Sequence, residues 1–213
     1  MPTDTSRHHH QSIATTRLEA FSDGVLAIII TIMVLEVHVP KEPTWAALAA
    51  IWPTLVAYAL SFIYVAIYWV NHHRLLDIAP HFSVKLHWTN AAMLFFLSLV
   101  PVTTGWIATF PLMPVPTATY LISLLLPGVA YVPLHREVVR LYGREIAPAH
   151  ILRAENTKQI ASILLYAGGA ALAFVHPVIA LICAALVSVL WIVPDGPVDQ
   201  VLTACAGQAI AKA

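Results

Sequence analysis

The sequence predicts an all-α membrane protein with six transmembrane helices per subunit. Of its 213 residues, 59% are hydrophobic and only 10% are charged, against about 25% charged residues in an average soluble domain. Residues 86–135 and 159–194 contain no Asp, Glu, Lys or Arg, and uncharged stretches of this length are typical of membrane spans. Lys plus Arg and Asp plus Glu are balanced at 11 each, which argues against a nucleic-acid-binding protein.

The number of spans follows from helix length. One crossing takes about 20 residues, so we expect residues 86–135 to form two helices, separated at the three prolines of residues 109–116. Residues 159–194 are expected to form a hairpin bent at His176–Pro177. Pro101, Pro127 and Pro133 are expected to break the third and fourth helices, and the fourth is a candidate to continue past Arg136 toward Tyr142. The expected spans are residues 18–38, 46–71, 87–109, 117–135, 159–175 and 177–194.

The basic residues predict the orientation. With six spans and the amino terminus inside, every Lys and Arg except Lys41 lies on the cytoplasmic side, a strong positive-inside pattern. We therefore expect a polar cytoplasmic tail over residues 1–16, a transmembrane domain over residues 17–195, and a cytoplasmic tail over residues 196–213. No signal peptide is predicted. The run His8–His10 is interpreted as solvated, although three histidines also suggest a metal site.

The first expected helix differs from the others. Only 12 residues, Gly24 to Leu35, separate Asp23 from Glu36, and they rise only about 18 Å, which is too short to cross a core about 30 Å thick. An ionisable group must therefore enter the apolar layer or its edge, where such groups face a bundle interior or a water-filled path. The alternative is that both carboxylates lie at the headgroup level of a locally thinned bilayer.

One stripe of this helix stands out by its spacing. Gly24, Ile28, Thr31, Leu35 and His38 follow one another at intervals of four, three, four and three residues, so they share a helix face. Taken alone, such a stripe is more often a packing face than a pore lining, and the Thr31 hydroxyl is expected to bond the carbonyl of Ala27.

Polar residues also gather where the second helix ends and the third begins. Buried polar side chains need partners, so we expect a network that joins this cluster to the start of the first helix. Its expected members are Arg17, Ser22, Asp23, Asn71, His72, His73 and Asn90. A metal site at His72, His73 and Asp77 is a weaker alternative, because adjacent helical residues point about 100° apart. The sequence lacks Gly-x-Ser-x-Gly, His-Glu-x-x-His and Thr-Val-Gly-Tyr-Gly motifs, so we predict neither an enzyme nor a carbonyl-filter channel.

The stretch Arg17 to Gly24 carries a recognisable signature. It matches the pattern Arg-x-x-x-Phe-Ser-Asp-Gly, and the likeness continues through residues 28–36, 67–73, 97–101 and 191–195. On these residues the chain resembles the transmembrane-protein-175 family of lysosomal potassium channels and their bacterial relatives. The signature occurs once, as in the bacterial form, for which four copies surround one pore.

The resemblance implies roles for the stripe and the signature. It implies that the first helix lines the pore, with a narrow hydrophobic constriction at Ile28, a further apolar layer at Leu35, and potassium preference at Thr31. It further implies that Phe21 wedges against neighbouring helices, that Gly24 allows their close approach, and that Asp23 anchors the gating network with Arg17.

The sequence and the resemblance together predict a homotetrameric, potassium-selective channel in a bacterial inner membrane. Its partners would be potassium ions, the lipid bilayer and its own copies, with no nucleic acid, no metal and no cofactor. The alternative is a secondary transporter or proton pathway that uses Asp23 and the histidines of helices two and three as a relay, although no inverted repeat or mid-helix break in the first helix supports a transporter. A membrane scaffold without transport is a third interpretation.

Overall fold

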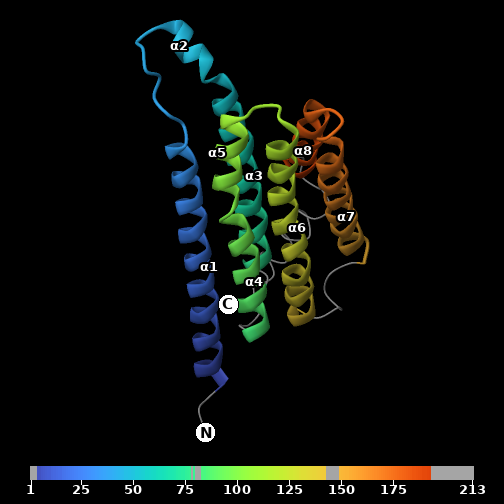
Figure 1. Ribbon diagram of the computed structural model, residues 1–213. Coiled ribbons are helices and arrows are strands. Elements are labelled where there is room, and N and C mark those ends of the chain that lie inside the picture. Colours follow the sequence, from blue (N-terminus) through green and yellow to red (C-terminus); the bar gives the residue numbers. More distant parts are fainter. Residues whose placement is uncertain (1–3, 78, 80–82, 143–148, 193–213) are drawn as a thin grey trace.

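The computed structural model describes residues 4–77, 79, 83–142 and 149–192, and the described part is a bundle of α-helices with no strand (Figure 1). The helices are α1 (Asp4–Leu35), α2 (Trp45–Ala50), α3 (Trp52–Asp77), α4 (Val84–Leu97), α5 (Val100–Thr109), α6 (Pro114–Tyr142), α7 (Ala149–Leu172) and α8 (Pro177–Ile192). The expected carboxyl-terminal tail, residues 196–213, lies outside the described residues, as do the side chains of His8–His10 and Asp77.

Four helical segments of the described chain are long and apolar enough to cross a membrane. They are Thr16–Leu35, Trp52–Leu76, Val84–Thr109 and Pro114–Leu141, and the apolar helix α8 is shorter. The chain is therefore an all-helical membrane protein by composition and structure. The four segments correspond to the first four expected spans, and α7 and α8 fall where the last two were expected.

Prolines explain two of the helix boundaries. The third expected span divides into α4 and α5 at Ser98–Leu99, because Pro101 has no N–H to donate to the carbonyl of Leu97 and its ring crowds that oxygen. The expected hairpin bend is confirmed, since α7 ends at Leu172 and α8 begins at Pro177. The same rule was wrong for Pro127 and Pro133, which lie inside a continuous α6 that extends to Tyr142. Membrane helices tolerate proline when neighbouring helices satisfy the freed groups.

Helix α1 begins earlier than expected. It starts at Asp4 and continues without interruption to Leu35, so most of the expected polar tail is helical. Figure 1 shows α1 at one edge of the bundle and α7 and α8 at the opposite edge, with α6 between them. Helix α1 packs on α3, α4 and α5, whereas α6 packs on α4, α5, α7 and α8.

Buried hydroxyl groups join the helices inside the bundle. Ser61 of α3 forms hydrogen bonds with Thr104 of α5 (2.8 Å) and Tyr120 of α6 (2.9 Å). Thr103 of α5 bonds Ser123 of α6 at 2.6 Å. Such polar contacts and close-packed small residues hold membrane helices together, because lipid supplies no hydrophobic drive between them.

The small residues of α7 divide between an inner and an outer face. A Cβ atom on Gly169 would lie 2.5 Å from Leu121 Cδ2 and 3.1 Å from Cys183 Cβ, so this glycine allows α7 to approach α6 and α8 within the subunit. A Cβ on Gly168 would meet nothing within 4 Å. The close contact at Gly169 therefore lies within the subunit.

Replacement of the two glycines tests this packing. Gly169→Val should destabilise the detergent-solubilised protein by about 1–3 kcal/mol, because extra methyl groups overpack a close contact. Gly168→Val is the matched control and should change the thermal unfolding midpoint little. Equal effects of the two substitutions would contradict the described packing of α7.

Candidate functional site

Helix α1 has one face buried against its own subunit and one face without cover. Leu18, Ser22, Leu26, Ile29 and Met33 are at most 4% exposed, and their spacing places them on a single helix face. The opposite face is exposed and includes Arg17, Ala20, Phe21, Gly24, Ala27, Ile28, Thr31 and Leu35. A helix of a membrane bundle with such an apolar outer face meets lipid, another copy of the chain, or a pore.

Four residues of the predicted stripe, Gly24, Ile28, Thr31 and Leu35, lie on this uncovered face, whereas His38 lies beyond the end of α1 at Leu35. Ile28 is 59% exposed and Leu35 is 76% exposed, and a Cβ atom on Gly24 would meet nothing within 4 Å. The Thr31 hydroxyl donates to the carbonyl of Ile28 at 2.8 Å, three residues back, rather than to that of Ala27 as expected. Its oxygen remains on the exposed face, where it retains acceptor capacity.

A buried chain of hydrogen bonds ties α1 to α3 and α4. His72 Nε2 lies 2.6 Å from Asn90 Oδ1, Asn90 Nδ2 donates to Ser22 Oγ at 2.9 Å, and the Ser22 hydroxyl donates to the carbonyl of Leu18 at 2.9 Å. The side chains of His72, Asn90 and Ser22 are all fully buried. Because Asn90 Oδ1 can only accept, the Nε2 atom of His72 carries the proton. These bonds join three members of the expected network, Ser22, His72 and Asn90.

A second set of contacts lies outside the first, at the same end of the bundle. Trp69 Nε1 donates to Asp23 Oδ1 at 3.0 Å, and the Trp69 ring stacks on His73 with centroids 6.3 Å apart. His73 Nδ1 lies 2.5 Å from Glu19 Oε1. Sequence reasoning missed Trp69 and Glu19. Their spacing indicates these contacts. Glu19 lies four residues before Asp23 on α1, and Trp69 lies four residues before His73 on α3, so each pair shares one face of its helix.

Two expected members of the network, Arg17 and Asn71, are placed elsewhere, and Phe21 lies on the outer face of α1. Arg17 is exposed, and within the described part of the chain no ion pair joins it to Asp23. The Asn71 amide donates to the carbonyl of Ile67 in its own helix at 2.7 Å. Phe21 is 56% exposed, so more than half of its surface is free of contact within the subunit. The described residues contain no group of three His, Cys, Asp or Glu side chains arranged to hold a metal ion.

The far end of α1 carries the second carboxylate of the short stretch. Glu36 follows the last residue of α1, and its carboxylate lies over Gly105 of α5, where an added Cβ would come within 2.7 Å of Glu36 Oε2. Asp23, by contrast, lies inside the candidate span Thr16–Leu35. Within that span, the Asp23 carboxylate has the Trp69 indole as its hydrogen-bond partner.

The two asparagines provide a test of the buried chain. Asn90→Ala should destabilise the protein by about 1–3 kcal/mol, because it leaves the buried Nε2–H of His72 without an acceptor. Asn71→Ala removes only a bond within its own helix and should cost less. Thermal unfolding of both variants in detergent checks this order, and a larger loss for Asn71→Ala would contradict it.

Comparison with known proteins identifies relatives, one of which matches most of the chain. A family model described as "Endosomal/lysosomal potassium channel TMEM175" matches residues 17–101. A protein named as a potassium channel from Chryseobacterium sp. (strain P1-3) is 43% identical over 186 residues, which cover 87% of this chain and 96% of that protein. Another potassium channel, from Streptomyces collinus, is 40% identical over 98 residues, 44% of this chain and 48% of its own length.

More distant relatives include a solved structure and a human protein. The crystal structure of a lysosomal potassium-selective channel TMEM175 homologue from Chamaesiphon minutus superposes with a TM-score of 0.71 at 26% identity, covering 84% of this chain and 96% of that one. The human "Endosomal/lysosomal proton channel TMEM175" is 29% identical over 117 residues, 49% of this chain and 23% of the human protein. The signature, the helix arrangement and the near full-length match together show that the chain belongs to the TMEM175 family.

Proposed function

We propose that the chain forms a potassium-selective cation channel whose pore is lined by α1. The observation that carries the proposal is the uncovered face of α1, on which Gly24, Ile28, Thr31 and Leu35 point away from the subunit's own core. The printed names of the Chryseobacterium and Streptomyces relatives support potassium as the permeant ion. An enzyme is excluded by family membership.

The proposal includes an assembly and a topology. Four copies would surround one axis, with α1 of each copy innermost and Gly24 and Phe21 available for contact with the neighbouring copy. Helices α7 and α8 would complete six spans in residues 17–195, with tilt or local thinning compensating for their short apolar length. The distribution of Lys and Arg supports cytoplasmic tails at residues 1–16 and 196–213 in a bacterial inner membrane.

Conduction would be controlled at Ile28. Four isoleucine side chains close to a narrow axis exclude water, and a small rotation or separation of the helices admits it. Leu35 would form a second apolar layer about two turns farther along. Asp23, Trp69, His73 and Glu19, together with the buried chain at Ser22, would transmit movement of α3 and α4 to α1.

The Thr31 hydroxyls would supply potassium preference. Four hydroxyl oxygens can replace part of an ion's hydration shell, but they offer fewer ligands than a filter made of backbone carbonyls. We therefore expect a moderate preference for potassium over sodium.

A hydrophilic substitution at the constriction tests the role of Ile28. Ile28→Asn should hydrate the narrow point and raise the potassium current of protein reconstituted in planar bilayers. Ile182→Asn is the matched control, because Ile182 is 52% exposed on α8, away from α1, and its replacement should leave the unitary conductance unchanged. An unaltered conductance in Ile28→Asn would show that Ile28 does not line the pore.

Removal of the hydroxyl at position 31 tests selectivity. Thr31→Ala should move the reversal potential measured with potassium on one side and sodium on the other toward zero. Thr119→Ala serves as the control, since the Thr119 hydroxyl likewise donates to a carbonyl of its own helix, that of Val115, at 2.9 Å. Equal reversal potentials in wild type and Thr31→Ala would contradict the proposed role.

A proton pathway is the second candidate function. It is favoured by the name of the vertebrate relatives as proton channels and by the buried His72, whose Nδ1 has no hydrogen-bond partner among the described residues. Currents in a bath where a large organic cation replaces potassium, measured under a pH gradient, separate the two. If the chain is a potassium channel, the current should fall when potassium is removed. A current that follows only the proton gradient would favour the proton pathway.

A further inference from the structure

A large groove lies between α6 and α7, far from the exposed face of α1. It has a volume of about 950 Å³, within the range of about 300–1,000 Å³ typical of ligand sites. The exposed side chains of Lys85, Arg136 and Arg140 lie at its rim with the buried Glu137 behind them, and its lining includes Val132, Val139, Ile160 and Ile163. Figure 1 shows the end of α6 and the start of α7 at the same end of the bundle as the start of α1.

The charges at the rim are arranged to attract an anion. The carboxylate of Glu137 is buried and faces inward, where it receives Arg140 through two hydrogen bonds of 2.6 and 3.0 Å, Lys85 at 3.3 Å, and the Ser83 hydroxyl at 3.0 Å. The Lys85 and Arg140 side chains remain 66% and 62% exposed. Arg136 also lines the groove and is exposed, so the groove carries three cations, of which two pair with the single carboxylate of Glu137.

An unpaired donor lies deeper in the groove. Gln159 of α7 is only 6% exposed, and its Nε2 atom has no hydrogen-bond partner among the described residues. A buried amide without an acceptor is costly, and native structures rarely leave one unexplained. Because Gln159 lines the groove, a small rotation of its side chain would turn this donor toward an acceptor oxygen of an occupant.

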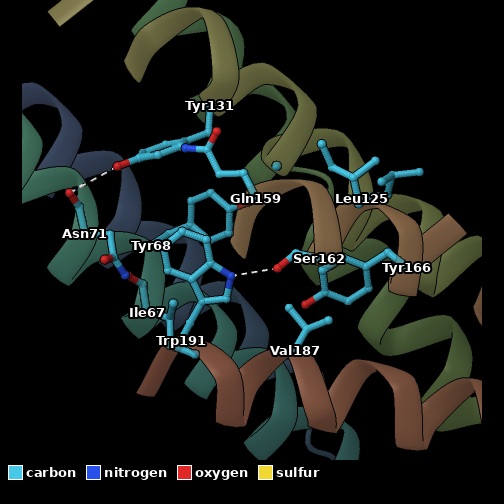
Figure 2. Close-up of a pocket in the computed structure, with 12 residues that line it drawn as sticks. Ile67, Tyr68, Asn71, Leu125, Tyr131, Gln159, Ser162, Tyr166, Val187 and Trp191 are labelled. Atoms are coloured by element: carbon cyan, nitrogen blue, oxygen red, sulfur yellow. Dashed lines mark hydrogen bonds between the residues drawn. The ribbon is translucent and has the colours of Figure 1, made fainter. Parts of the chain in front are cut away.

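Gln159 and Ile163 also line an adjoining apolar cavity of about 50 Å³ between α3, α6, α7 and α8. Figure 2 shows Tyr68, Tyr131, Tyr166 and Trp191 around this cavity, with Tyr131 bonded to Asn71 and Trp191 to Ser162. The path inward from the rim therefore changes from cationic to amide to apolar and aromatic.

We propose that the groove between α6 and α7 binds one anionic diacyl phospholipid of the surrounding membrane. Arg136, with Arg140 and Lys85, holds the phosphate, Gln159 Nε2 donates to an ester carbonyl, and an acyl chain lies along Ile160 and Ile163. The order of these groups matches a phospholipid, in which the ester carbonyls lie between the phosphate and the hydrocarbon. Basic pockets between transmembrane helices at one membrane face are suited to anionic headgroups. Lipid binding at this site does not depend on ion conduction, so it can be tested independently of the proposed channel function.

Native mass spectrometry of the full detergent-solubilised chain, titrated with phosphatidylglycerol or phosphatidylcholine carrying the same acyl chains, tests the headgroup contact. The wild type should retain phosphatidylglycerol more tightly. Arg136→Gln should weaken its retention about fivefold, as expected for the loss of one cation at a membrane surface, without changing that of phosphatidylcholine. Lys41→Gln, outside the groove, is the control and should have no effect. Equal retention of the two lipids by the wild type, or no effect of Arg136→Gln, would overturn the proposal.

The ester contact has its own test. Wild type should retain ester-linked phosphatidylglycerol more tightly than a dialkyl ether phosphatidylglycerol, which has the same headgroup and no carbonyl. Gln159→Leu should remove this difference, while Arg136→Gln should preserve it. A wild type that does not distinguish ester from ether lipid would overturn the assignment of Gln159. Unchanged thermal unfolding of each variant verifies that the bundle is intact.

Discussion

The rotation of α1 about its own axis depends on the buried hydrogen bonds that join His72, Asn90 and Ser22. Each of these polar side chains lies in apolar surroundings, where the loss of a partner is expensive. Successive residues of a helix point about 100° apart, so a shift by one residue would carry Ser22 away from Asn90. The same bonds therefore determine that Ile29 faces the subunit's core and that Ile28 faces outward. Any function assigned to the outer face of α1 rests on this contact.

The contacts around Asp23 add a second restraint on the rotation of α1. Breaking them costs less free energy than breaking the buried chain. The indole of Trp69 and the pair formed by His73 and Glu19 lie nearer the surface of the bundle, where polar groups retain partial access to water or lipid headgroups. The inner chain can thus fix the helix while the outer set changes partners. In the proposed channel, this division between a fixed and an adjustable contact would suit a helix that moves by a small amount to open a path.

The helices and their order follow from the sequence, because charge-free length and proline positions are local properties. Pro101 and Pro177 mark boundaries that the structure confirms, whereas Pro127 and Pro133 lie inside α6 because the surrounding helices decide whether a freed carbonyl is tolerated. The spacing of Gly24, Ile28, Thr31 and Leu35 predicts a common face, and the structure places all four outward. The asparagine that joins the buried chain was not predictable in the same way. Asn71 and Asn90 have the same side chain, and the packing of α3 and α4 decides the direction in which each one points.

Cysteine substitution on α1 tests most directly whether its outer face lines an ion path. In a background with Cys183 and Cys205 replaced by serine, Ile28→Cys and Leu26→Cys place thiols on opposite faces of the helix. Cadmium, which thiolates bind well, should block the potassium current of Ile28→Cys, because several copies of the thiol would meet around one axis, and should leave Leu26→Cys unaffected. Block at Leu26→Cys together with an insensitive Ile28→Cys would contradict the account.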